Sequence, residues 1–161
     1  MTADNLARFR LMCRQFRALA IFMVVSVGGL LALAPVAFFL AQGDRPVRLL
    51  VEQVLWALPA LFYLFAVWSI GSAMGQLAKG RLIQPTLSSA LRRVGLALGL
   101  GGVLSVFGVT NLMRLLGLTQ GGFAYFDIAG MTLGMIGGAL FLLGRVIDHA
   151  GRIQAEMDEM I

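Results

Sequence analysis

The sequence predicts an all-α integral membrane protein, a single domain built as a four-helix bundle with an amphipathic helical extension at its C-terminus. Hydrophobic residues make up 59% of the 161 residues, more than a water-soluble fold of this length carries. They are gathered into four runs without a charged side chain, at 18–41, 53–78, 94–113 and 128–144. This distribution argues against most classes of soluble enzyme.

The lengths of the four runs are close to the span of a membrane helix, for which about 20 residues are needed. The runs hold 24, 26, 20 and 17 residues, and the short last run is preceded by an uncharged stretch at 115–126. We therefore expect its helix to start near Phe123 or Ala124. The predicted spans are 18–41, 53–78, 94–113 and 124–144, with a tail at 145–161. The first run is too long for the apolar part of a cleaved signal peptide, and we expect it to be retained.

Lysine and arginine side chains are distributed unevenly between the segments that flank the runs. The N-terminal tail, the second loop and the C-terminal tail hold four, four and two of them, whereas the first and third loops hold two and one. Loops rich in Lys and Arg stay on the cytoplasmic side of a membrane. The bias predicts an N-in, C-in orientation and a cytoplasmic tail.

The N-terminal tail has a helical pattern that leaves two interpretations open. Leu6, Phe9 and Met12 fall on one face of a helix, and Arg10 and Arg14 on another. Such a helix can lie on anionic headgroups in the plane of the membrane surface. Alternatively, it extends the first span, and its arginines serve only to set the orientation.

Prolines and a glycine mark expected features of the helices. Pro35 and Pro59 lie inside the first and second runs, where each removes a backbone hydrogen bond. Pro46 and Pro85 lie where helices are expected to begin, a position at which the missing N–H costs nothing. Gly80 is a suitable residue to end the second helix.

Small residues recur at helical spacing in three of the runs. In lipid there is little hydrophobic drive between helices, so small residues that let backbones approach are typical of helix contacts. The fourth run has two overlapping GxxxG steps, so we expect its helix to be central to the bundle or to form a dimer seam. The candidates for helix packing are Gly71, Gly75, Gly95, Gly99, Gly130, Gly134 and Gly138.

The C-terminal tail carries one apolar stripe, with residues at alternating spacings of four and three. This is the pattern of an amphipathic helix, so we expect the fourth helix to run on past the membrane as a rod. The stripe either packs beneath its own bundle or docks a partner. The tail is acidic at its end and the second loop is basic. The candidates for docking are Arg92, Arg93, Val146, Ala150, Ile153, Glu156, Met157, Asp158 and Met160.

The residues for catalysis or for holding a cofactor are sparse. His149 is the only histidine, which leaves neither paired haem ligands nor a zinc set. No charge falls inside a run, where it would mark an ion path. We expect Asn111 and Gln76 to bond between helices, and Arg114 and Asp127 to pair at the outer edge. We predict no enzyme activity, cofactor, metal, small-molecule substrate or direct nucleic-acid binding.

Two motifs resemble a known family. Residues 79–83 (Lys-Gly-Arg-Leu-Ile) and 91–95 (Leu-Arg-Arg-Val-Gly) resemble a Lys-Gly-x-x-Phe … Leu-Arg-Arg-Ile-Gly pattern. Residues 144–161 resemble an Arg-Val-Phe … Leu-x-x-Glu-x-Asp-x-x-Val tail. With four spans, the chain is similar to the bacterial membrane family called domain of unknown function 2975. Ile83 replaces the expected Phe, and Gln-Pro-Thr at 84–86 replaces a Ser/Thr-x-Glu-Asn stretch.

The resemblance implies a bacterial inner membrane and, because some members of that family pair with small helix-turn-helix regulators, a soluble partner. We expect a non-enzymatic small membrane protein whose tail and second loop engage a cytoplasmic partner such as a transcription regulator. One alternative is a subunit of an oligomeric transporter or channel, formed around the glycine face of the fourth helix. Another is a structural subunit of a larger membrane complex. Apart from the lipid bilayer, the expected partners are a cytoplasmic protein or further copies of the chain.

Overall fold

The computed structural model describes residues 3–42, 47–79, 83–120 and 122–159 of the chain. The described residues contain helices and no strand, so the chain is all-α as predicted. The elements in order are α1 (Ala3–Gln42), α2 (Val47–Ala78), α3 (Ile83–Val103), the π-helical segment η1 (Leu104–Gly108), α4 (Val109–Leu115) and α5 (Ile128–Glu159).

Four helical stretches in the described part of the chain are long and apolar enough to cross a membrane. Three lie in α1, α2 and α5, at Arg8–Ala37, Val47–Ala78 and Ile128–Ile153. The other, Pro85–Leu115, runs through α3, η1 and α4 without a break. These lengths and compositions are those of a multi-pass membrane protein.

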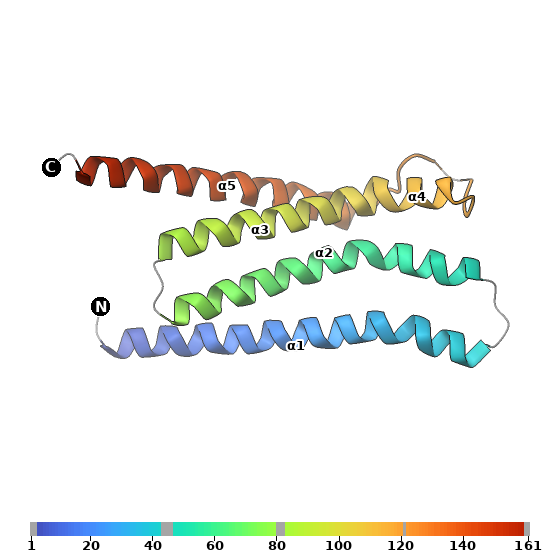
Figure 1. The fold of residues 1–161 in the computed structure, drawn as a ribbon, viewed down its shortest axis with the longest axis horizontal. Coiled ribbons are helices and arrows are strands. Elements are labelled where there is room, and N and C mark those ends of the chain that lie inside the picture. The colour runs from blue at the N-terminus through green and yellow to red at the C-terminus, as the bar shows by residue number, and fades with distance from the viewer. Residues whose placement is uncertain (1–2, 43–46, 80–82, 121, 160–161) are drawn as a thin grey trace.

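The four spans form an open layer instead of a closed bundle. Helix α1 packs on α2, α2 on α3, and α3 on α5, and no other pair of these four helices comes into contact within the described residues. Figure 1 shows them side by side in chain order. Of the two alternatives predicted for the fourth helix, a central position is wrong, because α5 lies at one edge of the layer and α1 at the other. A dimer seam stays a prediction.

The N-terminal tail continues the first span as one helix, since α1 runs unbroken through both. Pro35 lies inside α1 and Pro59 inside α2. Pro85 lies in the first turn of α3, where its missing N–H has no partner to lose. Helix α2 ends at Ala78, and Gly80 lies outside the described residues.

Helix α5 begins at Ile128, later than the predicted start near Phe123 or Ala124. The reason is a cap at Asp127, whose Oδ1 accepts a hydrogen bond from the Ala129 N–H at 3.1 Å. Its carbonyl accepts the Met131 N–H at 3.0 Å. Aspartate is among the preferred residues at this position because its side chain satisfies a free N–H of the first turn.

Helices α3 and α5 approach each other through glycines on both helices. A Cβ added to Gly95 would lie 2.6 Å from the Gly137 carbonyl oxygen, and one added to Gly137 would lie 2.7 Å from that of Gly95. A Cβ on Gly102 would lie 2.7 Å from the Gly134 Cα. Side chains are thus excluded here, and the two backbones touch. We call this contact the glycine seam; its members are Gly95, Gly102, Gly134, Gly137 and Gly144.

The predicted packing glycines divide between the seam, α1 and open space. Gly95 and Gly134 belong to the seam, and a Cβ on Gly130 would meet Ser105 and Asp127. Cβ atoms on Gly71 and Gly75 would lie 2.9 Å from Ala20 and from Arg17 of α1, respectively. Cβ atoms on Gly99 and Gly138 would meet no atom within 4 Å.

The placement of Gly138 differs from the prediction for a geometric reason. A helix with 3.6 residues per turn returns to nearly the same face after seven residues, but turns about 80° away after eight. From Gly130, the face toward α3 therefore continues at Gly137 and Gly144, which are buried, and Gly138 is exposed.

Candidate functional site

A groove lies between α3 and α5 at the end of the layer where α1 begins and α5 finishes, which we call the terminal end. Its volume is about 610 Å³. One lining residue comes from α3 and the others from α5. They are Arg92, Arg145, Val146, Asp148, His149, Ala150, Arg152 and Ile153. We call this cavity the terminal groove.

The terminal groove lies where α5 runs alongside and then past the beginning of α3. The seam ends where Gly144 lies against Ser88 and Arg92, near the beginning of α3. Helix α5 continues to Glu159, and Figure 1 shows its end projecting beyond α3. The apolar residues Val146 and Ile153 lie about 200° and 180° round α5 from Gly144, so they face away from α3, and no helix in the described part of the chain covers them.

The terminal groove combines positive charge with exposed apolar surface. Arg152 Nη2 lies 3.2 Å from Asp148 Oδ2, one turn away on the same helix. Arg92 and Arg145 form no ion pair with any described residue. Val146 is 63% exposed and Ile153 is 44% exposed. Such a surface suits a ligand that is both acidic and apolar.

Four of the predicted docking residues meet in the terminal groove: Arg92, Val146, Ala150 and Ile153. Arg93 is exposed and does not line it, and Met157 is exposed further along α5. The side chains of Glu156, Asp158 and Met160 lie outside the described part. The prediction missed Arg145, which directly follows the last seam glycine, Gly144. The seven-residue spacing of Gly130, Gly137 and Gly144 is the sequence signal that could have placed this part of α5 beside α3.

The opposite end of the layer, which we call the loop end, holds a second group of polar contacts around η1. The Val109 N–H donates to the Leu104 carbonyl, five residues back, which widens the helix and frees carbonyl groups. The Val106 carbonyl accepts the Tyr125 N–H at 2.9 Å. The connection between α4 and α5 thus folds back onto η1.

The side-chain amide of Asn111 finds its hydrogen-bond partners at the loop end. The prediction that it bonds to another spanning helix is wrong. The Asn111 Nδ2 donates to the Phe107 carbonyl and to the Phe123 carbonyl, both at 2.8 Å. The first bond lies within the helix and the second ties down the connection. Gln76, the other predicted interhelical amide, lines a cavity between α1 and α2.

Asp127 bonds to Ser105 and not to Arg114, so the predicted Arg114–Asp127 pair is wrong. The Ser105 Oγ donates to Asp127 Oδ2 at 2.5 Å, and Arg114 instead stacks its guanidinium 4.4 Å from the centre of the Phe123 ring. The Ser105 hydrogen bond, followed by the backbone N–H groups of Gly130 and Ala129, lowers the pKa of Asp127 below its ordinary value.

Potential metal ligands do not gather anywhere in the described part of the chain. No group of three His, Cys, Asp or Glu side chains that could hold a metal ion occurs among those residues. The loop-end contacts are used to cap α5 and to satisfy η1. The terminal groove is therefore the stronger candidate for a functional site.

Comparison with known proteins gives no relative. No family model matches the chain, and neither a curated protein nor a solved structure matches it. The resemblance to the family called domain of unknown function 2975 therefore has no support from these comparisons.

Proposed function

We propose that the chain is a non-enzymatic multi-pass protein of a bacterial inner membrane that docks a cytoplasmic protein in the terminal groove. The observation that carries this proposal is the convergence of Arg92 from α3 with seven residues of α5, between Arg145 and Ile153, in one groove. The bias of Lys and Arg toward this end supports an N-in, C-in orientation, which puts the groove and the end of α5 in the cytoplasm.

The chemistry of the groove indicates the kind of partner. Its three arginines exceed its single carboxylate, Asp148, so an acidic partner is attracted. The exposed Val146 and Ile153 lie seven residues apart, the spacing of two helical turns. An amphipathic helix with acidic residues beside its apolar face matches both features. A small transcription regulator that carries such a helix is the partner implied by the resemblance.

The test is affinity purification of the tagged full-length protein from its native membrane in mild detergent, with identification of any stoichiometric soluble partner. Replacing Arg92→Glu together with Ile153→Glu should weaken binding of that partner by at least about tenfold, since it puts negative charge where the partner is acidic. Deleting residues 152–161 should have the same effect.

The matched control for the Arg92→Glu part of the double variant is Arg93→Glu, which makes the same change of charge one residue away, outside the groove. It should leave the partner bound. A partner that remains bound to the deletion variant, or that is lost equally with Arg93→Glu, contradicts docking in the groove.

A second candidate function, a subunit of a larger membrane assembly or of an oligomeric transporter or channel, is favoured by the open layer. Gly138 lies on the uncovered side of α5 beside the exposed Met135 and Leu142, and a small residue on such a face suits close approach of another helix. Native mass in lipid nanodiscs separates the candidates. A homo-oligomer or a fixed membrane partner, lost with Gly138→Leu, would favour assembly over docking.

A further inference from the structure

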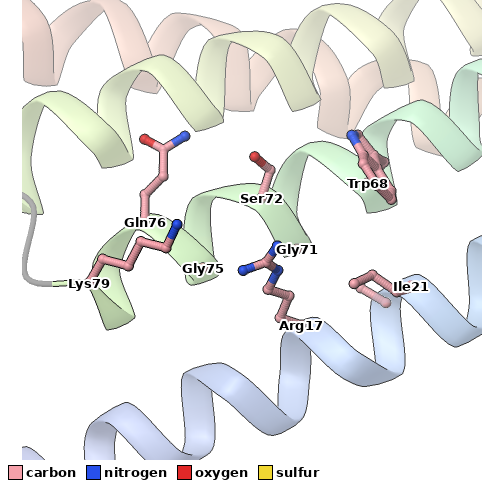
Figure 2. Close-up of a pocket in the computed structure, with 9 residues that line it drawn as sticks. Arg17, Ile21, Trp68, Gly71, Ser72, Gly75, Gln76 and Lys79 are labelled. Atoms are coloured by element: carbon pink, nitrogen blue, oxygen red, sulfur yellow. The ribbon is translucent and has the colours of Figure 1, made fainter.

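A second cavity lies between α1 and α2 at the terminal end, apart from the terminal groove. Its volume is about 310 Å³. It is lined by Arg17 and Ile21 of α1 and by Trp68, Ser72 and further residues of α2. Figure 2 shows the Arg17 guanidinium turned toward α2, Lys79 near the end of α2, and Ser72 and Gln76 on the side of α2 away from α1. We call this space the cationic cavity.

The cationic cavity holds two positive groups and no acidic one. Arg17 and Lys79 line it together with Ser72 and Gln76, which can donate hydrogen bonds. Neither cation forms an ion pair within the described part of the chain. The carbonyl end of α2 favours a nearby cation, which accounts for Lys79 but not for an arginine brought in by the neighbouring helix.

Two glycines of α2 make room for α1 and for the arginine head. A Cβ on Gly71 would lie 2.9 Å from the Ala20 Cβ, so this glycine sets the close approach of the helices. A Cβ on Gly75 would lie 2.9 Å from both Cδ and Nη1 of Arg17. The guanidinium therefore rests against the bare backbone at Gly75, turned into the space between the helices (Figure 2).

The position of the cavity along the spans matches the surface of a bilayer. Arg17 directly precedes the first apolar run, and Lys79 directly follows the second. Placing the apolar runs in the hydrocarbon core puts both cations at its edge, the level of the phospholipid phosphate groups. The apolar lining residues Ile21 and Trp68 are 37% and 50% exposed, which leaves surface for an acyl chain.

From this geometry we propose that the cationic cavity binds the phosphate group of an anionic phospholipid, with its acyl chain along the exposed apolar side chains of α1 and α2. Arg17 supplies charged N–H donors, which suit phosphate oxygens. Lys79 adds a second charge, and Ser72 and Gln76 add neutral donors. Basic pockets between membrane helices bind anionic headgroups for these reasons. The proposal needs a membrane but does not depend on the docking of a protein partner.

The test measures binding of phosphatidylglycerol and of phosphatidylcholine to the delipidated full-length protein by native mass spectrometry in uncharged detergent. The wild type should prefer phosphatidylglycerol. The double variant Arg17→Gln/Lys79→Gln should raise the dissociation constant for phosphatidylglycerol by at least about tenfold, because charged hydrogen bonds are lost. The variant Arg14→Gln/Arg93→Gln makes the same change in net charge outside the cavity, and should change the constant less than about twofold.

A second variant tests the geometry without a change of charge. Gly75→Ala displaces the Arg17 guanidinium and should weaken phosphatidylglycerol binding several-fold, whereas Gly138→Ala should not alter it. Equal loss in both double variants, or full binding by Arg17→Gln/Lys79→Gln, would overturn the site. Displacement of the lipid by millimolar glycerol 3-phosphate would overturn the assignment to a lipid in favour of a soluble phosphate compound.

Discussion

The two halves of the layer use glycine in different ways. Between α3 and α5, glycines on both helices face backbone, as at Gly95 and Gly137. Between α1 and α2, the glycines face side chains, as Gly75 faces Arg17 and Gly28 faces Leu64. The α1–α2 contact also buries little of α1: in its described part, the buried residues are Cys13 and Ala20.

This difference indicates which half of the layer is rigid and which half can adapt. Two backbones in contact cannot move apart or admit a side chain without losing the packing that holds helices together in lipid. A flexible arginine against a glycine can move and can exchange its neighbours for a ligand. We therefore expect the α3–α5 half to set the stability of the protein, and the α1–α2 half to tolerate change.

The largest effect is expected from a substitution in the glycine seam. Gly137→Val should lower the free energy of unfolding by about 3 kcal/mol, because its Cβ would lie 2.7 Å from the Gly95 carbonyl oxygen and 2.9 Å from the Leu98 carbonyl carbon. Gly138→Val is the matched control and should change stability by less than about 0.5 kcal/mol. Denaturation in mixed detergent micelles, followed by tryptophan fluorescence, measures both. Equal losses in the two variants would show that α3 and α5 do not meet at Gly137.

A smaller effect is expected in the other half. Gly71→Ala should cost about 1 kcal/mol, because the new methyl group would lie 2.9 Å from the Ala20 Cβ and α1 can shift away toward lipid. Gly29→Ala, where the added methyl group meets no atom within 4 Å, is the control for the same assay. A loss at Gly71 as large as that at Gly137 would remove the contrast between the halves.

The sequence was sufficient to predict four spanning helices and the all-α class, because runs such as 18–41 and 53–78 carry that information locally. It did not give the order of helices in space, because a glycine face such as that of α5 reads the same at the centre of a bundle or at an edge. Periodicity placed Val146 and Ile153 together on one stripe of α5. Their meeting with Arg92 depends on the lengths and register of α3 and α5, which only the structure provides.

A pH-dependent effect is expected at the loop end. The pKa of Asp127 is lowered in the folded protein, chiefly by the Ser105 hydrogen bond. The resulting stabilisation is present above the unfolded pKa of about 4 and is lost as the pH falls through the lower folded value. Asp127→Asn should lower the melting temperature by a few degrees at pH 7 and should flatten the loss of stability of the wild type below pH about 4. Identical acid profiles for the two proteins would contradict this role of the carboxylate.

The smallest effect is expected where α2 meets α3. The Tyr63 hydroxyl is buried without a hydrogen-bond partner among the described residues, and its ring lies against Gly101. Tyr63→Phe removes this unpaired group and should leave the free energy of unfolding unchanged or raise it by about 0.5 kcal/mol. A loss above about 1 kcal/mol in the same micelle assay would mean that the hydroxyl has a partner.

The open layer is tested most directly by disulfide cross-linking in native membranes, in a Cys13→Ala background. The pair Ala20→Cys with Gly71→Cys lies in the contact of neighbouring helices, where a Cβ added to Gly71 would lie 2.9 Å from the Ala20 Cβ. A disulfide takes a Cβ separation of about 3.5–4.5 Å, which α1 reaches by a small shift away from α2, so this pair should cross-link within one chain after mild oxidation. The pair Gly29→Cys with Gly138→Cys places one cysteine in the middle of the apolar run of α1 and one in that of α5. These helices lie at opposite edges, so the pair should give no intramolecular product. Efficient intramolecular cross-linking of that second pair would show that α1 and α5 are neighbours in a closed bundle, and would contradict the layer.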